Sequence, residues 1–340
     1  MDKEKYLLDL KQALETSGCS PDYINVCTHY AAALLNRGVP VIFDREHLSL
    51  LLGVPSEQLN RIIFGESSYY RHVTIPKKSG GERELDIPTT TLKNIQRWIL
   101  DNILDRISTS SCSFGFKKHN SILDNASRHL GKTCVINMDI KDFFPSISFA
   151  QVFNVFSYYG YTKEVSFTLS KLCTYDGHLP QGSPASPYLS NVVCKKLDSR
   201  LLSLAERFRA DYSRYADDLS FSGGRGIEKM IPVISSIVQD EGFLINQKKT
   251  RIAYSHQKQE VTGLIVNGKT VRVCRKYKRD VEKDLYYCKK YGVSDHMNHI
   301  GCNKAFYKEH LFGKILFIKM IEQTEGERLE EHFNEIKWDY

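Results

Sequence analysis

The stretch Tyr215-Ala216-Asp217-Asp218 decides how this chain is interpreted, because two adjacent carboxylates stand between two short runs of strand-forming residues. The runs are Asp211-Tyr212-Ser213-Arg214 and Leu219-Ser220-Phe221, and they predict a β-hairpin with acids at its tip. The turn holds no glycine and its two negative charges repel each other, so local preferences are broken where a cation would restore them. Mg²⁺ is such a cation, because it binds one or two carboxylates and completes its shell with water and phosphates.

A third carboxylate follows an apolar run. Cys134-Val135-Ile136-Asn137-Met138 predicts a buried strand that ends at Asp139, after which Ile140–Pro145 turns the chain away. Two strands side by side would bring Asp139 next to Asp217 and Asp218. Three carboxylates there could hold two metal ions about 3.5–4 Å apart, which stabilises the attacking and leaving oxygens of phosphoryl transfer. A lone Asp-Asp pair is more often a solvated turn, so the hypothesis depends on the surrounding motifs.

Those motifs occur in a fixed order. Phe143-Phe144 follows Asp139, Leu179–Pro184 lies between the two acidic motifs, and Gly242–Thr250 lies downstream. From about residue 71 to residue 266 the set resembles the palm motifs of reverse transcriptases. The resemblance implies an α+β right-hand polymerase with fingers, a palm of antiparallel sheet and helices, and a small helical thumb. The expected domains are an N-terminal helical extension (1–68), fingers and palm (69–265) and thumb (266–340).

Two short elements narrow the resemblance. Asn125-Ala126-Ser127-Arg128-His129 resembles the Asn-Ala-x-x-His element of retron reverse transcriptases, and Val261-Thr262-Gly263 resembles their Val-Thr-Gly element. Alone, the first could cap or pack a helix, since residues four apart share a helical face, and the second could be any strand entering a turn. The resemblance implies that the RNA-binding residues include Asn125, His129, Val261, Thr262 and Gly263.

A retron reverse transcriptase implies a specific reaction. Such an RNA-directed DNA polymerase copies part of a cognate structured non-coding RNA from deoxynucleoside triphosphates, primes from an internal guanosine 2′-hydroxyl, and yields a branched RNA–DNA hybrid, msDNA. It also implies a separately encoded effector protein and a role in anti-phage defence. The alternatives are a group II intron-like or other bacterial reverse transcriptase, and an idle RNA-binding module with the polymerase fold. The chain ends soon after the expected thumb, which argues against a group II intron-like enzyme. All three acids are present, which argues against an idle RNA-binding module.

Roles at the active site follow from the resemblance. Asp139 and Asp217 are expected to bind two Mg²⁺ ions, with Asp218 assisting and the backbone carbonyl of Ile140 adding an oxygen. The reaction needs positioning and charge neutralisation more than covalent catalysis. Lys249 is expected to protonate the departing pyrophosphate, with the adjacent Lys248 as the alternative.

The resemblance also implies nucleotide contacts from three places. Phe144 should lie under the sugar and exclude a ribose 2′-hydroxyl, although Phe143 could exchange roles with it. Gly182 allows close backbone approach, and Gln181 should touch the nucleotide or template base. The third place is a basic hairpin formed by Tyr70–Ile75 and Arg83–Ile87. Its cations for the triphosphate are Arg83 and Lys77 or Lys78.

Charge is unevenly distributed along the chain. It has 47 Lys and Arg against 40 Asp and Glu, and 13 Lys/Arg against four Asp/Glu lie between residues 246 and 290. This segment is expected to follow the RNA backbone, although a charge run can also be a solvated helix face. Its RNA-binding candidates are Arg272, Arg275, Lys276, Lys278 and Arg279.

The flanking regions are expected to be helical. Residues 1 to about 65 should contain a helix that ends at Gly53 and another capped by Ser56, and Leu92–Leu100 is amphipathic. Residues 276–336 have helical spacing, with aromatic side chains that either stack on bases or form the core. These are Tyr277, Tyr286, Tyr287 and Tyr291.

The sequence also indicates where the protein is located and in which redox state its cysteines are. No segment has the length of a membrane span and the charged start lacks the apolar core of a signal peptide, so we expect a cytoplasmic protein with no membrane partner. Nine cysteines without a Cys-x-x-Cys pattern fit reduced, mostly buried thiols. One Cys/His cluster matches no zinc spacing: Cys288, His296, His299 and Cys302.

Overall fold

The chain forms two compact units in this computed structural model, which describes residues 2–76, 80–302 and 305–338. The first unit comprises Met1–Lys117, Ile140–Arg200 and Ser235–Ile245, and the second comprises Lys118–Asp139, Leu201–Ile234 and Asn246–Tyr340. Each unit is therefore assembled from segments distant in sequence. The expected domain boundaries at residues 68 and 265 concern the N-terminal extension, the fingers and palm, and the thumb, and they remain a prediction.

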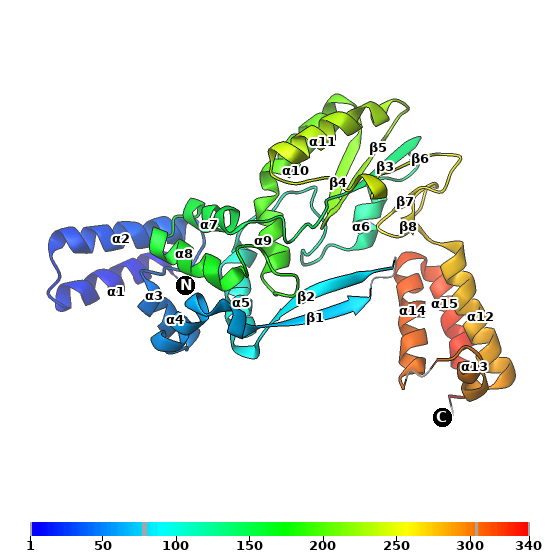
Figure 1. The fold of residues 1–340 in the computed structure, drawn as a ribbon, viewed down its shortest axis with the longest axis horizontal. Coiled ribbons are helices and arrows are strands. Elements are labelled where there is room, and N and C mark those ends of the chain that lie inside the picture. Colours follow the sequence, from blue (N-terminus) through cyan, green and yellow to red (C-terminus); the bar gives the residue numbers. More distant parts are fainter. Residues whose placement is uncertain (1, 77–79, 303–304, 339–340) are drawn as a thin grey trace. The chain divides into compact units, whose positions relative to one another are not determined.

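The first unit is mainly helical, with one two-stranded sheet (Figure 1). Its elements are α1 (Lys3–Thr16), α2 (Pro21–Asn36), α3 (Arg45–Leu52), α4 (Ser56–Phe64), η1 (Glu66–Tyr69), β1 (Tyr70–Pro76), β2 (Glu82–Pro88), α5 (Thr90–Asn102), η2 (Leu104–Arg106), α7 (Phe149–Tyr158), α8 (Lys163–Cys173) and α9 (Ser186–Val193). Two further helices continue from one unit into the other: α10 (Lys195–Arg207) and α11 (Ile231–Asp240).

The N-terminal helices follow the expected pattern with one correction. Asp44 caps α3 by accepting a 2.7 Å hydrogen bond from the backbone N–H of His47, and Gly53 ends it with a φ of 64°, a left-handed conformation that glycine adopts without strain. The expected cap at Ser56 was wrong. Helix α4 begins at Ser56 after Pro55, and the Ser56 hydroxyl instead lies 2.9 Å from that of Ser49.

The expected basic hairpin is confirmed as β1 and β2. The strands are antiparallel, with Tyr70 opposite Pro88 and Pro76 opposite Glu82. Most of its side chains are exposed. Exposure on both faces fits a hairpin that meets a ligand rather than one that covers a core.

The second unit contains the other two sheets and the C-terminal helices (Figure 1, orange to red). Its elements are α6 (Ile122–Ser127), β3 (Cys134–Asp139), β4 (Asp211–Tyr215), β5 (Asp218–Gly223), η3 (Ile227–Met230), η4 (Gln247–Lys249), β6 (Arg251–Tyr254), β7 (Glu260–Val261), β8 (Leu264–Ile265), β9 (Arg272–Val273), α12 (Arg275–Tyr291), α13 (Val293–His299), α14 (Tyr307–Ile321) and α15 (Gln323–Asn334).

The larger sheet has the strand order β4-β5-β3-β6, and all its pairings are antiparallel. The predicted buried strand is confirmed, because only Asn137 of β3 is more than slightly exposed. Tyr212 of β4 and Phe221 of β5 are paired residues whose rings stack with centroids 4.8 Å apart. Such aromatic cross-strand pairs stabilise a sheet beyond their buried area. The α+β fold with an antiparallel sheet is thereby confirmed.

Two apolar clusters complete the second unit. One joins α6 and β3 to the sheet β7-β8-β9 through Ala126, Val135 and Leu264. The other forms the core among α12, α14 and α15, with Leu285, Leu311 and Leu329 at its centre. The expected helices between 276 and 336 are therefore present.

Two bulk expectations can be compared with the structure. Six of the nine cysteines are buried, as expected. Over the described residues, no helix combines the length and apolarity needed to cross a bilayer.

Candidate active site

The acidic hairpin is built on a strained turn. Tyr215 of β4 pairs with Asp218 of β5, which leaves Ala216 and Asp217 as the two turn residues. Ala216 has a φ of 57°, and a left-handed conformation costs a residue with a Cβ about 1–2 kcal/mol. Beneath it, the fully buried Arg214 donates from Nη1 to the Ala216 carbonyl oxygen at 3.2 Å. The turn is thus held in a conformation that its sequence disfavours, a pattern typical of functional sites.

Asp139 stands opposite this turn, as expected. It is the last residue of β3 and pairs directly with Asp218 of β5, so the sheet register brings the carboxylates of Asp139, Asp217 and Asp218 to one edge. The backbone carbonyl of Asp139 accepts a 2.8 Å hydrogen bond from the N–H of Asn246. This bond ties the downstream segment to the end of β3.

Lys249 lies against the carboxylates. Its Nζ donates to Asp139 Oδ2 at 2.6 Å, and this hydrogen bond, with the charges of all three acids, raises the pKa of Lys249. The ammonium group is more than half exposed while Asp139 is almost buried, so the pair is open on the lysine side. Lys248 is exposed as well, but only Lys249 is bonded to Asp139.

The charged form of the Asp218 carboxyl group is disfavoured at this edge. Loss of water around its carboxyl group, followed by the charges of Asp217 and Asp139, raises the pKa of Asp218 to about 7, although Lys249 opposes the shift. The charge of the nearby Lys249 does not fully offset the lost hydration and the repulsion by the two other acids. Three carboxylates, which are hard oxygen donors, suit Mg²⁺ by their chemistry.

The described side chains of the three acids do not converge on one point. Among the described residues, no three His, Cys, Asp or Glu side chains converge into a metal-binding group, and Lys249 supplies the positive charge at Asp139. Among the described residues, Cys288, His296, His299 and Cys302 do not converge on one point either. His296, which is buried, lies 3.3 Å from Asp284 and stacks on Tyr287, so it belongs to the packing of the C-terminal helices.

The two phenylalanines after β3 differ in exposure. Phe143 is 5% exposed and packs against Phe243, with ring centroids 6.2 Å apart. Phe144 is half-buried and its ring lies 6.0 Å from that of Phe116. Phe144 is therefore the one whose ring is open to a ligand. Sequence reasoning missed Phe116, because nothing in its local motif marks it.

Gln181 and Gly182 lie against the β1–β2 hairpin. The carbonyl of Gln181 accepts a 2.9 Å hydrogen bond from the N–H of Asp86. Gly182 has a φ of 141°, and a Cβ there would stand 2.7 Å from the Asp86 carbonyl oxygen. The close approach that requires glycine is thus to β2. Arg83 is exposed on the same strand, whereas Lys77 and Lys78 lie outside the described residues.

The candidate RNA-binding residues fall into two groups. Asn125 and His129 are buried, and Asn125 Nδ2 donates to Thr262 Oγ1 at 3.4 Å. Thr262 and Gly263 form the turn between β7 and β8, with φ of 47° and 83°, as a type I′ turn requires. Val261 is buried beside this turn.

The basic candidates are mostly on the surface. Arg272 on β9 and the α12 residues Arg275, Lys276 and Arg279 are exposed, whereas Lys278 is paired with Glu322 at 2.9 Å.

The aromatic candidates on α12 also differ in their exposure. Tyr286 and Tyr291 are more than half exposed, whereas Tyr277 packs its ring against Phe317. Tyr287 stacks on Tyr291.

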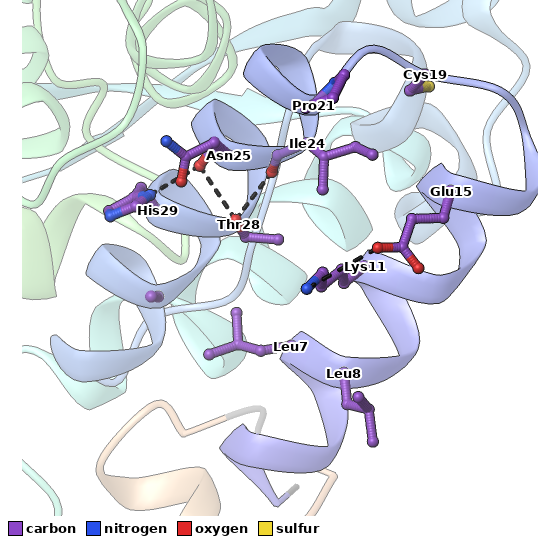
Figure 2. A pocket seen from close by; sticks show the side chains of 11 residues that line it. Leu7, Leu8, Lys11, Glu15, Cys19, Pro21, Ile24, Asn25, Thr28 and His29 are labelled. Carbon is purple, nitrogen blue, oxygen red and sulfur yellow. Dashed lines mark hydrogen bonds and ion pairs between the residues drawn. The ribbon is translucent and has the colours of Figure 1, made fainter.

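A cavity of about 860 Å³ lies between α1, α2 and the turn that joins them (Figure 2). Its wall combines apolar side chains such as Leu7 and Ile24 with an ion pair between Lys11 and Glu15, 3.9 Å apart. None of the residues predicted from the sequence to bind nucleotide or RNA lines it.

Known proteins resemble this chain over most of its length. Residues 75–267 match the family described as reverse transcriptase (RNA-dependent DNA polymerase). The chain is 35% identical over 326 residues to the retron Ec86 reverse transcriptase of Escherichia coli, covering 94% of this chain and 96% of that protein. It is 34% identical over 322 residues to the retron Mx65 reverse transcriptase of Myxococcus xanthus, covering 88% and 73%.

A solved structure shares a more distant likeness. It is a telomerase from Candida albicans in complex with a fragment of telomeric RNA, with 10% identity and a TM-score of 0.47. The alignment covers 79% of this chain and 61% of that one, so this chain spans less than two thirds of the telomerase.

Proposed function

Because this chain belongs to the retron-type reverse transcriptases, and is thus an RNA-directed DNA polymerase, we propose that it copies part of a cognate structured RNA into DNA. Synthesis starts from a guanosine 2′-hydroxyl within that RNA and yields the branched hybrid msDNA. The observation that carries the proposal is the pairing of Asp139 with Asp218 at one sheet edge, with Asp217 in the adjoining turn.

The carboxylates form the catalytic centre in this proposal. Asp139, Asp217 and Asp218, with the backbone carbonyl of Ile140, are the residues that would hold two Mg²⁺ ions. Bound there, the metal supplies the positive charge that stabilises the attacking and leaving oxygens. Lys249 keeps a proton on Nζ and gives it to the departing pyrophosphate. Its hydrogen bond to Asp139 supports this role, because the proton is already held at the carboxylates.

Other residues position the nucleotide. Arg83, with Lys77 or Lys78, binds the triphosphate, while Gln181 and Gly182 contact the nucleotide or template base. Phe144 excludes a ribose 2′-hydroxyl and so selects deoxynucleotides. The exposure of Phe144 beside the buried Phe143 supports this assignment.

The RNA is bound by the second unit. The exposed cations of β9 and the start of α12 neutralise backbone phosphates, and the turn at Thr262 and Gly263 meets the cognate RNA. Asn125 contributes by holding Thr262. The exposed cations are Arg272, Arg275, Lys276 and Arg279, while the buried Val261 supports the turn at Thr262 and Gly263 and Lys278 adds its charge from its pair with Glu322.

The biological setting follows from kinship with retron enzymes. We propose that the protein acts in the cytoplasm with a separately encoded effector, as part of anti-phage defence. Co-purification of the tagged protein from its native host, with sequencing of the bound nucleic acid and identification of bound proteins, tests this. Recovery of neither an RNA-linked DNA nor a constant protein partner would contradict it.

Expression of the chain with the RNA encoded beside it tests the reaction itself. We expect a DNA product that remains attached to RNA after denaturation and that shortens, but keeps a short RNA remnant, after ribonuclease treatment. A DNA product wholly free of RNA would contradict priming from the RNA itself, and would favour another class of bacterial reverse transcriptase.

A further inference from the structure

His129 packs against the two strands of the acidic hairpin. It follows the end of α6 and is fully buried. Its ring nitrogen Nδ1 lies 2.7 Å from the hydroxyl of Ser222, and Nε2 lies 2.7 Å from the hydroxyl of Ser213. Both nitrogens are therefore engaged within the protein, and neither faces solvent where RNA would bind.

The two serines belong to different strands of the hairpin. Ser213 is on β4 and Ser222 is on β5. Ser213 pairs with Ser220, and Ser222 pairs with Asp211, so the two hydroxyls are diagonal neighbours on one face. A single imidazole thus bridges both strands that lead to the strained turn at Ala216.

Burial keeps the bridging ring neutral. A neutral imidazole has one N–H donor and one acceptor, so it donates to one serine and accepts from the other. Burial, reinforced by Arg128 and Lys132 and opposed by Asp211, lowers the pKa of His129 to about 4. The ring is therefore uncharged at the pH where polymerases work.

A second contact from the same segment reaches the base of the hairpin. Lys132 Nζ lies 2.5 Å from Oδ2 of Asp211, the first residue of β4. Both side chains are more than a third exposed, so this ion pair contributes little alone. It shows, however, that residues 129–132 hold β4 at two points.

We propose that His129 is a positioning residue for DNA synthesis: by bridging Ser213 and Ser222 it fixes the two strands that present Asp217 and Asp218 beside Asp139. The inference rests on the proposed role of those carboxylates. It assigns this histidine of the Asn-Ala-x-x-His element to catalysis on any template, rather than to contact with the cognate RNA.

The test compares two reactions: extension of a DNA primer annealed to unrelated RNA, and self-primed synthesis on the cognate RNA. His129→Leu removes both hydrogen bonds. We expect kcat to fall at least tenfold and by the same factor in both reactions, with KM for the nucleotide and Kd for the RNA within about twofold of the parent. His129→Gln should recover part of the lost kcat, because an amide can both donate and accept.

Serine variants decide the matter if His129→Leu does not fold. Ser213→Ala and Ser222→Ala each remove one contact and should lower kcat, and combining either with His129→Gln should give less than the product of the single effects. Ser170→Ala is the matched control, since that hydroxyl is fully buried but bonds the carbonyl of Ser166 within α8. Thermal melts accompany each variant.

Two results would overturn the inference. One is a loss confined to the cognate RNA with normal primer extension, which would make His129 an RNA-reading residue. The other is that Ser213→Ala and Ser222→Ala change kcat no more than the control Ser170→Ala does. If the unaltered protein extends annealed primers but makes no RNA-linked DNA, the proposed retron reaction is wrong. The role of His129 can still be tested by primer extension in that case.

Discussion

Asp139 and Asp218 form the last antiparallel pair between β3 and β5. This register joins a carboxylate that ends one strand to a carboxylate that begins another, and the adjoining turn adds Asp217. The repulsion among them is relieved in this structure by Lys249 at Asp139. Lys249 thus places positive charge at the same edge where the proposed reaction needs it.

Lys249 should matter far more than its neighbour Lys248. Lys249→Met removes the proton held beside Asp139, and we expect the rate of nucleotide incorporation to fall about 100-fold, as for loss of a general acid. Lys248→Met, which alters an exposed lysine without that contact, should stay within about threefold. Single-turnover incorporation with both variants measures this, and equal rates would contradict the assignment of the proton donor.

Phe144 should control the choice of sugar. Phe144→Ala opens space for a 2′-hydroxyl, so we expect ribonucleotide incorporation to rise relative to deoxynucleotide incorporation. The measurement is the ratio of kcat/KM values for matched nucleotides. Phe143→Leu provides the comparison, because Phe143 packs in the core and its change should affect thermal stability more than sugar choice. An unchanged ratio in Phe144→Ala would reverse the two roles.

His129 should make stability depend on pH. Its pKa of about 4 in the folded protein lies below the value of about 6.5 in an unfolded chain. The unfolded chain therefore binds the extra proton first, so the stability from the neutral ring is full above about pH 6.5 and is lost as pH falls toward 4. As the pH is lowered from 6.5 to 4, we expect the free energy of unfolding of the parent to decrease more steeply than that of His129→Gln. The expected difference in slope is about 1.4 kcal/mol per pH unit.

Urea unfolding of the two proteins at several pH values measures this difference. Comparing slopes rather than absolute stabilities removes any constant effect of the substitution. Parallel slopes would show that His129 is not held neutral by the fold.

Much of the fold and of the candidate site could be predicted because the signals are local. The acids of the hairpin, the apolar run before Asp139 and the turn at Gly53 each combine a residue type with a strand or helix pattern. The helix start at Ser56 was misassigned because a serine near a helix start suits two positions equally well. Pro55 takes the preceding place instead.

The supporting residues could not be predicted in the same way. Arg214 supports the strained turn and His129 bridges two strands, but both roles depend on contacts between segments distant in sequence. The pattern Asn125 to His129 suggested RNA recognition by resemblance. Only the tertiary structure reveals that the histidine ring is enclosed by β4 and β5.

The most direct test of the account is DNA synthesis by Asp217→Asn on the cognate RNA. The amide keeps the shape of the side chain but removes the charge that would bind Mg²⁺, and we expect RNA binding and the melting temperature to stay close to those of the parent. Labelled deoxynucleotide should become attached to RNA with the parent protein and not with the variant. Synthesis by Asp217→Asn within about tenfold of the parent, or roughly 1.4 kcal/mol in barrier, would contradict the central claim that these paired carboxylates form the polymerase site.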